Sequence, residues 1–304
     1  MGMGTVRIDL FISAIALVYM AALVFGVRAL LRRPVGRKLR WARRIVLSLA
    51  VLGVGCFVYA WRVEPYRLEV THTRVATAKL TRSVRIVHIS DVHSDPERRL
   101  EDRLPDVIAG EHPDVIVFTG DAINEPRGLE HFRTLMKQLA AIAPTYAVRG
   151  NWDVWYWSQL DLFGGTGVVE LTNLAARAPL QGAEVWIAGV PVGDERNIPR
   201  VLATVPATAV SVLLFHYPDE IEQASALGTD LYLAGHTHGG QVALPWYGAL
   251  ITYSRFDKRF EAGRYQVGPT TLYVSRGVGM EGGPAPRIRF CARPEVSVID
   301  LVPR

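Results

Sequence analysis

Two histidines of this 304-residue chain stand at alternate positions, 236 and 238, between glycines in the segment 235–240. The segment directly follows the apolar run 230–234. The run predicts a buried strand that a glycine turn terminates. Alternate residues after a strand can aim the imidazoles of His236 and His238 into one cleft, and neutral imidazole is a common transition-metal ligand. A single His-x-His segment is weak evidence for a metal site. Here it is the last of five strand-end clusters with metal-binding side chains, a pattern that predicts a two-metal hydrolase.

Four further apolar runs lead in the same way to a residue with a metal-binding side chain and then to a turn. Continuous apolar runs suit strands that are buried on both faces, with helices packed over the sheet. The carboxyl ends of such strands are where the sites of α/β proteins form. The runs and their residues are 84–90 with Asp91 and His93, 114–119 with Asp121, 145–149 with Asn151, and 210–215 with His216.

The ordered set of motifs resembles the calcineurin-like metallophosphoesterase superfamily over residues 84 to 301, which is most of the chain. In chain order the motifs are Asp-x-His, Gly-Asp, Gly-Asn, a lone His after a strand, and Gly-His-x-His. The tail at 272–279 and 293–295 looks like the membrane-associated or exported bacterial branch of that superfamily. The resemblance implies an α/β fold, a four-layer α/β/β/α sandwich, with metallophosphoesterase activity.

The resemblance also implies that the metal ligands are shared between two divalent transition-metal ions. Two such cations about 3.5–4 Å apart can hold a bridging hydroxide and stabilise the attacking and leaving oxygens of a phosphoryl displacement. Ligands of the His, Asp and Asn types fit Mn, Fe, Zn or Co better than Ca, without choosing among these metals. The family pattern puts Asp91, His93 and His238 on one ion and Asn151, His216 and His236 on the other, with Asp121 bridging both.

Trp152 departs from the commoner family pattern, in which a His directly after the Asn protonates the leaving group. An indole N–H can donate a hydrogen bond but has no suitable pKa for proton transfer, and general acid assistance is typically worth about 10²–10⁴-fold. The sequence therefore assigns no catalytic acid, and it leaves the preference among monoester, diester and pyrophosphate open. It also leaves two roles for Asp153, support of the metal site or a helix N-cap.

The front of the chain predicts a two-helix transmembrane hairpin. Residues 10–31 and 45–61 are apolar runs that would form helices about 33 Å and 25 Å long, against a bilayer core of about 30 Å. A cleavable signal peptide is the competing interpretation, but no small-residue cleavage site stands out. The segment 32–44 between the runs holds seven basic residues and no acid. By the positive-inside rule this loop stays cytoplasmic, which predicts an extracytoplasmic catalytic domain.

The basic balance of the chain belongs to this front part. Residues 1–62 carry ten Lys or Arg and one acid, whereas the rest carries 24 basic and 28 acidic residues. An acidic catalytic domain argues against nucleic acid as a partner, because phosphate backbones are held by basic surfaces. The predicted organisation is a membrane anchor with two transmembrane helices at 1–62, a linker and first strand at 63–83, and a metallophosphoesterase domain at 84–304.

The predicted function is metal-dependent hydrolysis of a phosphoester or pyrophosphate bond in a membrane- or envelope-associated substrate. Tethering raises the local concentration of membrane-bound molecules, so lipid-linked phosphates and pyrophosphates are the first expectation and cell-wall phosphodiesters the next. A rival hypothesis is a metal-binding envelope scaffold or sensor without turnover, and Trp152 is its only support. The sequence identifies neither the natural substrate nor the oligomeric state.

Overall fold

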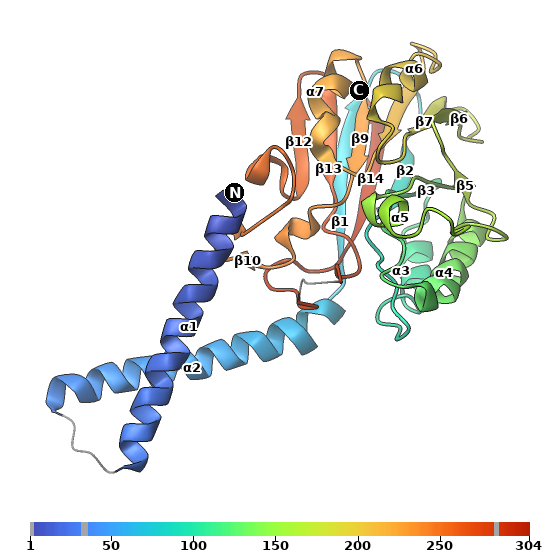
Figure 1. Cartoon of the computed structure of the whole chain (residues 1–304). Helices are drawn as coiled ribbons and strands as arrows, with labels where there is room; N and C mark the ends of the chain where they lie inside the picture. Colours follow the sequence, from blue (N-terminus) through green and yellow to red (C-terminus); the bar gives the residue numbers. More distant parts are fainter. Residues whose placement is uncertain (1–2, 32–35, 283–285) are drawn as a thin grey trace.

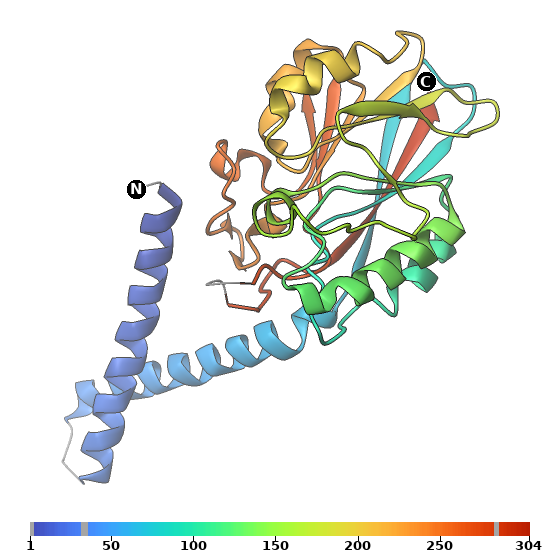
Figure 2. The same ribbon diagram turned by 45° about the vertical axis from the view of Figure 1, so that its right-hand side comes forward.

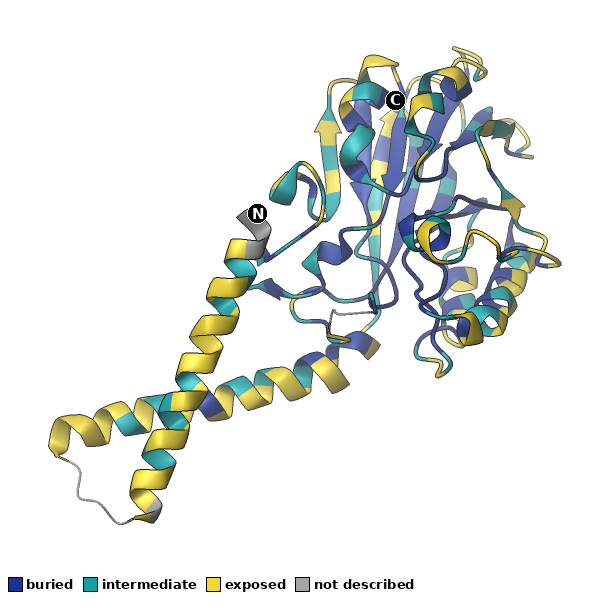
Figure 3. Ribbon diagram, viewed as in Figure 1, coloured by how far each residue is buried: buried dark blue, intermediate teal, exposed yellow. Residues whose placement is uncertain are grey.

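The computed structural model describes residues 3–31, 36–282 and 286–304. Two long helices, α1 (Met3–Leu30) and α2 (Arg37–Arg62), form a hairpin that projects from an α/β domain (Figure 1). Both helices are long and apolar enough to cross a membrane, over Val6–Ala29 and Arg37–Tyr66. They are exposed along most of their length (Figure 3). Length, composition and exposure support the membrane association that the apolar runs predict.

The basic segment between the two spans differs from the predicted loop. Its residues 32–35 lie outside the described part of the chain, whereas Arg37 to Arg44 form the first two turns of α2. Lys and Arg are good helix formers, and no proline or glycine interrupts the chain between Gly36 and the apolar run, so the helix begins before the apolar residues do. The predicted second span at 45–61 is therefore the inner part of a longer helix.

The described part of the domain contains two six-stranded mixed sheets and a small hairpin. Most neighbouring interior strands of both sheets pair in parallel, as continuous apolar runs predict, although one interior pair of the first sheet, 295–303 with 84–89, is antiparallel. The strand order of the first sheet is β1 (Glu69–Thr77), β14 (Glu295–Pro303), β2 (Val84–Ile89), β3 (Val115–Phe118), β4 (Thr145–Ala147), β5 (Val169–Glu170). The strand order of the second sheet is β12 (Gly263–Val267), β13 (Thr270–Val274), β9 (Leu231–Ala234), β8 (Val210–Leu214), β7 (Val185–Gly189), β6 (Leu174–Arg177). The hairpin pairs β10 (Ala243–Leu244) with β11 (Gly248–Ala249).

Helices cover the outer faces of both sheets, which gives the predicted four layers (Figure 2). Side chains such as Ile86 and Val117 of the first sheet pack against Ile187 and Leu233 of the second, so the main core lies between the sheets. The longer helices are α3 (Leu104–Gly110) and α4 (Leu129–Ile142) over the first sheet, α6 (Ile198–Leu202) and α7 (Ile221–Ala226) over the second, and α5 (Asn151–Trp155) after β4.

Short 3₁₀ turns complete the domain. They lie at Glu64–Tyr66, Pro126–Gly128, Glu195–Asn197, Pro218–Glu220, His238–Gly240 and Asp257–Phe260.

Strand β1 lies at the edge of the first sheet, where it pairs in parallel with β14 over its whole length. The strand predicted within 63–83 is therefore part of a sheet of the α/β domain. Contacts between the hairpin and that domain include two polar ones: the backbone N–H of Arg289 donates to the Ala60 carbonyl at 2.9 Å, and Arg7 pairs with Asp257 at 2.5 Å. The contacts involve the end of α2 and the start of α1, so both ends of the hairpin meet the domain.

Candidate metal centre

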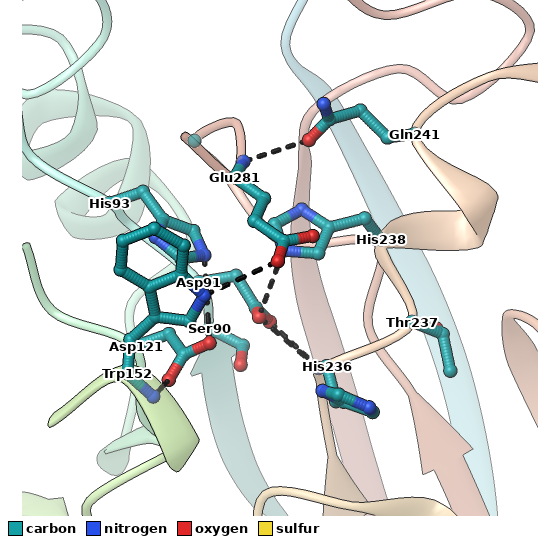
Figure 4. A network of polar contacts seen from close by, with 12 residues as sticks. Ser90, Asp91, His93, Asp121, Trp152, His236, Thr237, His238, Gln241 and Glu281 are labelled. Atoms are coloured by element: carbon teal, nitrogen blue, oxygen red, sulfur yellow. Dashed lines mark hydrogen bonds and ion pairs between the residues drawn. The ribbon is translucent and has the colours of Figure 1, made fainter. Parts of the chain in front are cut away.

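The seven predicted ligands gather where the carboxyl ends of strands from both sheets meet. Each ligand follows a strand within a few residues. Because parallel strands have their carboxyl ends at the same edge of a sheet, these residues come together there. Figure 4 shows the side chains of His93, His238 and the two aspartates turned toward one another. The ligands after β2 are Asp91 and His93, the one after β3 is Asp121, Asn151 follows β4, His216 follows β8, and His236 and His238 follow β9.

Two carboxylates lie at the centre of this cluster. The Nε2 atom of His238 is 3.2 Å from Oδ1 of Asp91, and Nε2 of His216 is 3.2 Å from Oδ2 of Asp121. Among the described residues there are two groups of three candidate ligand residues, and within each group the ligand atoms lie within 4.8 Å of one another; both groups contain Asp91. The first set adds His93 and His238, the trio that the family resemblance implies, and the second adds Asp121 and His216.

The position of Asp121 bears on its predicted bridging role. Its Oδ2 atom lies 3.6 Å from Nε2 of His93 and 3.2 Å from Nε2 of His216, one nitrogen from each predicted ligand set. Asp91 is also shared, since His216 Nε2 is 3.8 Å from Asp91 Oδ1. Both carboxylates are therefore placed between the two groups of histidines, and the bridging assignment stays a prediction.

His236 lies outside both three-residue sets, which contain only aspartates and histidines. Asn151 is buried at the first turn of α5. The backbone N–H of His236 points to the Asp91 carboxylate, 3.1–3.2 Å from its oxygens. The half-buried His236 ring lies 5.3 Å from the His216 ring and 4.3 Å from the Tyr217 ring, between centroids. Their roles as ligands remain predictions.

The donor set fits a cation. Among the described residues, buried atoms without a hydrogen-bond partner include both ring nitrogens of His93, Nε2 of His216 and Oδ1 of Asn151. An unpaired buried polar atom costs about 1–3 kcal/mol, and three residues with such atoms come from the strand ends that meet here. Imidazole nitrogens and an amide oxygen are suitable ligands for divalent transition metals, so the residues present fit the metal ions that the family resemblance implies.

The electrostatics of the cluster favour positive charge. Burial alone would lower the pKa of His216, but the carboxylates of Asp121 and Asp91 outweigh it and raise that pKa to about 9. Burial would likewise raise the pKa of Asp91, but His238 and His216 bring it below its usual range. Burial lowers the pKa of His93 to about 4, against the attraction of Asp121, so this ring is neutral and able to act as a ligand.

The backbone at the ligands is strained. Of the twelve described residues other than glycine with positive φ, five are predicted ligands, with φ between 44° and 69°. Such conformations cost of order 1–3 kcal/mol each and cluster at functional sites. The five are Asp91, His93, Asp121, His236 and His238.

Glycines in the motifs leave room for the carboxylates. A Cβ atom on Gly235 would lie 2.2 Å from Oδ2 of Asp91, and one on Gly150 would lie 2.2 Å from Oδ1 of Asp121. Neither distance is possible without a shift of the chain. Both positions therefore require glycine, because any side chain at Gly235 would collide with Asp91 and any side chain at Gly150 would collide with Asp121.

Asp153 supports the site and is not the N-cap of its helix. Gly150 occupies the N-cap position, and Asp153 stands at N3. Its carboxylate accepts N–H groups of Gly150, Asp121 and Ala122 at 2.8–2.9 Å, which ties the loop after β3 to the loop after β4. Burial and the nearby Asp121 raise the pKa of Asp153 to about 7.

Two further residues approach the cluster from the segment after β13, which has no apolar-run signal to identify them. Oε1 of Glu281 is 3.4 Å from the indole nitrogen of Trp152, close to His238 (Figure 4). Arg289 is fully buried, donates to the carbonyls of Gly279 and other residues, and brings one guanidinium nitrogen within 3.3 Å of Nδ1 of His238. Sequence reasoning missed both residues.

Comparison with known proteins agrees with this geometry. Residues 84–240 match the family described as calcineurin-like phosphoesterase. The uncharacterized metallophosphoesterase YkuE of Bacillus subtilis is 31% identical, over 83% of this chain and 92% of its own length. Phosphodiesterase YaeI of Escherichia coli is 30% identical, over 81% and 93%. UDP-2,3-diacylglucosamine pyrophosphatase LpxG of Chlamydia trachomatis is 25% identical, over 80% and 92%.

The match to the family covers more than half of the chain and spans every motif from β2 to the His-x-His segment. The family match, supported by relatives that include a phosphodiesterase and a pyrophosphatase, indicates phosphoester hydrolysis as the class of reaction and speaks against a scaffold without turnover. Our chain belongs to the calcineurin-like phosphoesterase family and is a phosphoester or phosphoanhydride hydrolase.

Proposed function

We propose that this enzyme hydrolyses a phosphoester or pyrophosphate bond of a lipid-linked substrate, at a dinuclear metal centre held by the seven predicted ligands. The observation that carries the proposal is the cluster of buried, unpartnered histidine and asparagine atoms around two carboxylates. Divalent cations bound there would lower the pKa of water and stabilise the charge that develops on the phosphoryl oxygens. The proposed ligands are Asp91, His93, Asp121, Asn151, His216, His236 and His238.

The residues of the chain prepare this site in identifiable ways. The ring of His216 lies with Nδ1 2.6 Å from the Thr119 carbonyl. A carbonyl only accepts, so Nδ1 carries the proton and Nε2 is left to act as a ligand. The Trp152 backbone N–H donates to Oδ1 of Asp121 at 2.9 Å and leaves Oδ2 toward the histidines. These contacts orient ligand atoms toward one point.

The lipid-linked substrate is proposed from two observations. The catalytic domain is joined to two helices of membrane-spanning length, which keeps the site near the bilayer. LpxG, one of the relatives, is named for action on a diacylated sugar nucleotide. The proposed organisation is the predicted one, an anchor at 1–62, a linker and first strand at 63–83, and the catalytic domain at 84–304.

The experiment is hydrolysis of soluble chromogenic esters by the full-length protein in detergent. The protein is first freed of metal with a chelator, and Mn²⁺, Fe²⁺, Zn²⁺ or Co²⁺ is then added. The rates of hydrolysis of bis(p-nitrophenyl) phosphate and of p-nitrophenyl phosphate are compared for each metal. The proposal expects metal-dependent turnover of at least one ester, with loss of about 10²-fold or more in Asp121→Ala, because removal of a central carboxylate leaves the cations uncompensated. Folded protein without turnover under every metal would contradict the proposal.

A further inference from the structure

An apolar cavity of about 480 Å³ lies between the membrane hairpin and the catalytic domain. Both helices contribute to its wall, as do two segments of the domain. Its volume falls within the range of about 300–1,000 Å³ that small-molecule sites occupy. Residues that shape it include Phe11 and Ile15 of α1, Leu52 and Phe57 of α2, and Ile288 and Phe290 of the domain.

The cavity offers almost no polar group to a ligand. Its wall is made of aliphatic and aromatic side chains, apart from Tyr19 and Cys56. The Tyr19 hydroxyl already donates to the Ala50 carbonyl at 3.1 Å. An apolar occupant is therefore favoured, since a polar ligand would lose its hydrogen bonds to water on entry.

A short stretch of the domain joins the cavity to the metal centre. Ile288 and Phe290 face the cavity, while Arg289 between them donates its backbone N–H to the Ala60 carbonyl of α2 at 2.9 Å. The Arg289 side chain reaches the other way and lies 3.3 Å from the His238 ring. One residue thus separates the wall of the cavity from a predicted metal ligand.

The second domain segment at the cavity makes the same connection. Val242 lines the cavity, is bridged to Phe290, and is the fourth residue after His238. Its neighbour Gln241 accepts the backbone N–H of Glu281 at 2.8 Å, and Glu281 faces the cluster (Figure 4). A molecule that filled the cavity would lie beside both chain segments that build the His238 side of the centre.

We propose that this cavity binds an acyl chain of the lipid-linked substrate, so that the hairpin is part of the substrate site as well as an anchor. The occupant is a hydrocarbon chain of a membrane lipid. Two walls of the cavity are helices of membrane-spanning length and composition, so the cavity borders the membrane that supplies such chains. The proposal rests on the proposed function, and it deepens that function by assigning the apolar part of the substrate to a site.

A chain-length series tests the proposal. The probes are p-nitrophenyl phosphodiesters of methanol, octanol and hexadecanol, assayed with the metal-loaded full-length protein in mixed micelles. The readout is the ratio of kcat/KM for the hexadecyl ester to that for the methyl ester. We expect a ratio of about 10 or more in the wild type, because burial of several methylene groups contributes about 0.8 kcal/mol each before ordering costs.

A matched pair of substitutions separates the cavity from general effects on the helix. Ala14 lines the cavity, whereas Ala16, two residues further along α1 and therefore on another face of the helix, does not. Ala14→Trp fills the cavity and should bring the ratio close to 1, whereas Ala16→Trp should keep the wild-type ratio. Equal ratios in the two variants, or no preference for the long chain in the wild type, would overturn the proposal.

Photocrosslinking gives a readout that does not depend on turnover. A hexadecyl phosphodiester with a diazirine at the chain end is irradiated with metal-free protein, and the labelled peptides are identified by mass spectrometry. The proposal expects label on α1, α2 or the segment at 288–290, reduced in Ala14→Trp and unchanged in Ala16→Trp. Label that Ala14→Trp leaves unchanged overturns the cavity, whereas correct labelling without hydrolysis of any ester overturns only the proposed function.

Discussion

Asp91 and Asp121 place two buried carboxylates within 3.2–3.8 Å of histidine nitrogens, and this charge arrangement dominates the site. A buried carboxylate is stable only when positive charge balances it. The arrangement explains why the pKa of His216 is raised while that of Asp91 is lowered. In the metal-free cluster, the carboxylates of Asp91 and Asp121 favour protonation of nearby histidine. The same two carboxylates would attract metal cations.

Trp152 determines how the enzyme should respond to its leaving group. Its indole packs edge-on against the His93 ring, 5.4 Å between centroids, and lies where the commoner family pattern has a proton donor. Without an acid there, the rate should depend steeply on leaving-group pKa, so nitrophenyl esters turn over and alkyl esters are slow. Trp152→His should accelerate poor leaving groups by up to about 10²–10⁴-fold. The measurement is a Brønsted plot for both proteins.

Equal slopes in the two Brønsted plots, with the metal content unchanged, would show that another group supplies the proton.

Glu295 should couple stability to acid pH. Its side chain is almost fully buried, accepts Nε of Arg276 at 3.0 Å and accepts the Thr71 hydroxyl at 2.6 Å. Burial would raise the pKa of Glu295, but Arg276 and the hydrogen bonds outweigh it and lower that pKa. The stabilisation is therefore complete above the unfolded-state value of about 4.3 and is lost as pH falls through the lower folded-state pKa. Glu295→Gln should destabilise the fold by about 1.5–3 kcal/mol at pH 7, because Arg276 keeps Glu69 as a partner but loses its charged hydrogen bond to Glu295.

Chemical denaturation at pH 7 and at pH 3 measures this effect, and the difference between wild type and Glu295→Gln should shrink at the lower pH. Asp102→Asn is the control, because Asp102 is 67% exposed in its ion pair with Arg98. Such a surface pair contributes about 0–1 kcal/mol. A constant difference at both pH values would contradict the account of Glu295.

At the scale of single residues, the sequence predicted the set of side chains at the site but not their supports. The ligands follow apolar runs and stand in a fixed order, so pattern alone locates them. Asp153 could be assigned only from its contacts, because a carboxylate early in a helix suits both a cap and a loop support. Glu281 and Arg289 come from an irregular segment in which nothing repeats, and only the folded chain brings them to the cluster.

At the scale of elements, the site depends on how closely one strand end passes another. The turn after β9 lies directly on the turn after β2, and Gly235 is the point of contact with Asp91. The segment after β13 presses on the same aspartate from another side, where a Cβ on Gly277 would be 2.5 Å from the Cβ of Asp91. Any side chain at these glycines moves a strand end.

Gly235→Ala should therefore impair metal binding more than folding. Its Cβ would lie 2.0 Å from Oγ of Ser90 and 2.2 Å from Oδ2 of Asp91, so the turn that carries His236 must shift. We expect metal affinity to fall about 10–100-fold, as when the supports of ligands are lost. Titration of metal-free protein with Mn²⁺ by calorimetry measures it. Gly110→Ala is the control, because nothing lies within 4 Å of its Cβ position, and unchanged affinity in both variants would contradict the packing argument.

The sequence predicted elements well where their pattern is regular. The four-layer fold that the family resemblance implies is confirmed. The helix that contains the predicted second span at 45–61 begins about two turns earlier, at Arg37. The residues from Arg37 to Arg44 have high helix propensity although they are not apolar. The left-handed backbone at the ligands could not be predicted, since tertiary contacts impose it against the preference of each residue.

At the scale of the whole molecule, the hairpin and the domain meet at both ends of the hairpin. Arg7 near the start of α1 pairs with Asp257, and Ala60 near the end of α2 accepts from Arg289. The basic turns at the start of α2 lie at the opposite end of that helix. This arrangement is compatible with the topology predicted from the positive-inside rule, in which the domain lies outside the cytoplasm, opposite to the basic segment.

A reporter fusion tests this topology. Alkaline phosphatase fused after Arg304 should be active, because it requires an oxidising compartment outside the cytoplasm, and a fusion after Gly36 should be inactive. A fluorescent reporter that folds in the cytoplasm should give the opposite pattern at the two positions. Cytoplasmic signals at both Arg304 and residue 62 would overturn the orientation, and substrates on the inner leaflet would then become the better proposal.

The most direct test of the account is the metal content of active protein. Full-length enzyme that hydrolyses a phosphodiester, analysed by elemental mass spectrometry, should contain about two transition-metal ions per chain, since two candidate ligand groups meet at the strand ends. Asp121→Ala should retain fewer than one ion and lose activity, while Gly110→Ala should match the wild type in both. Fully active enzyme with one ion or none per chain would contradict the dinuclear centre.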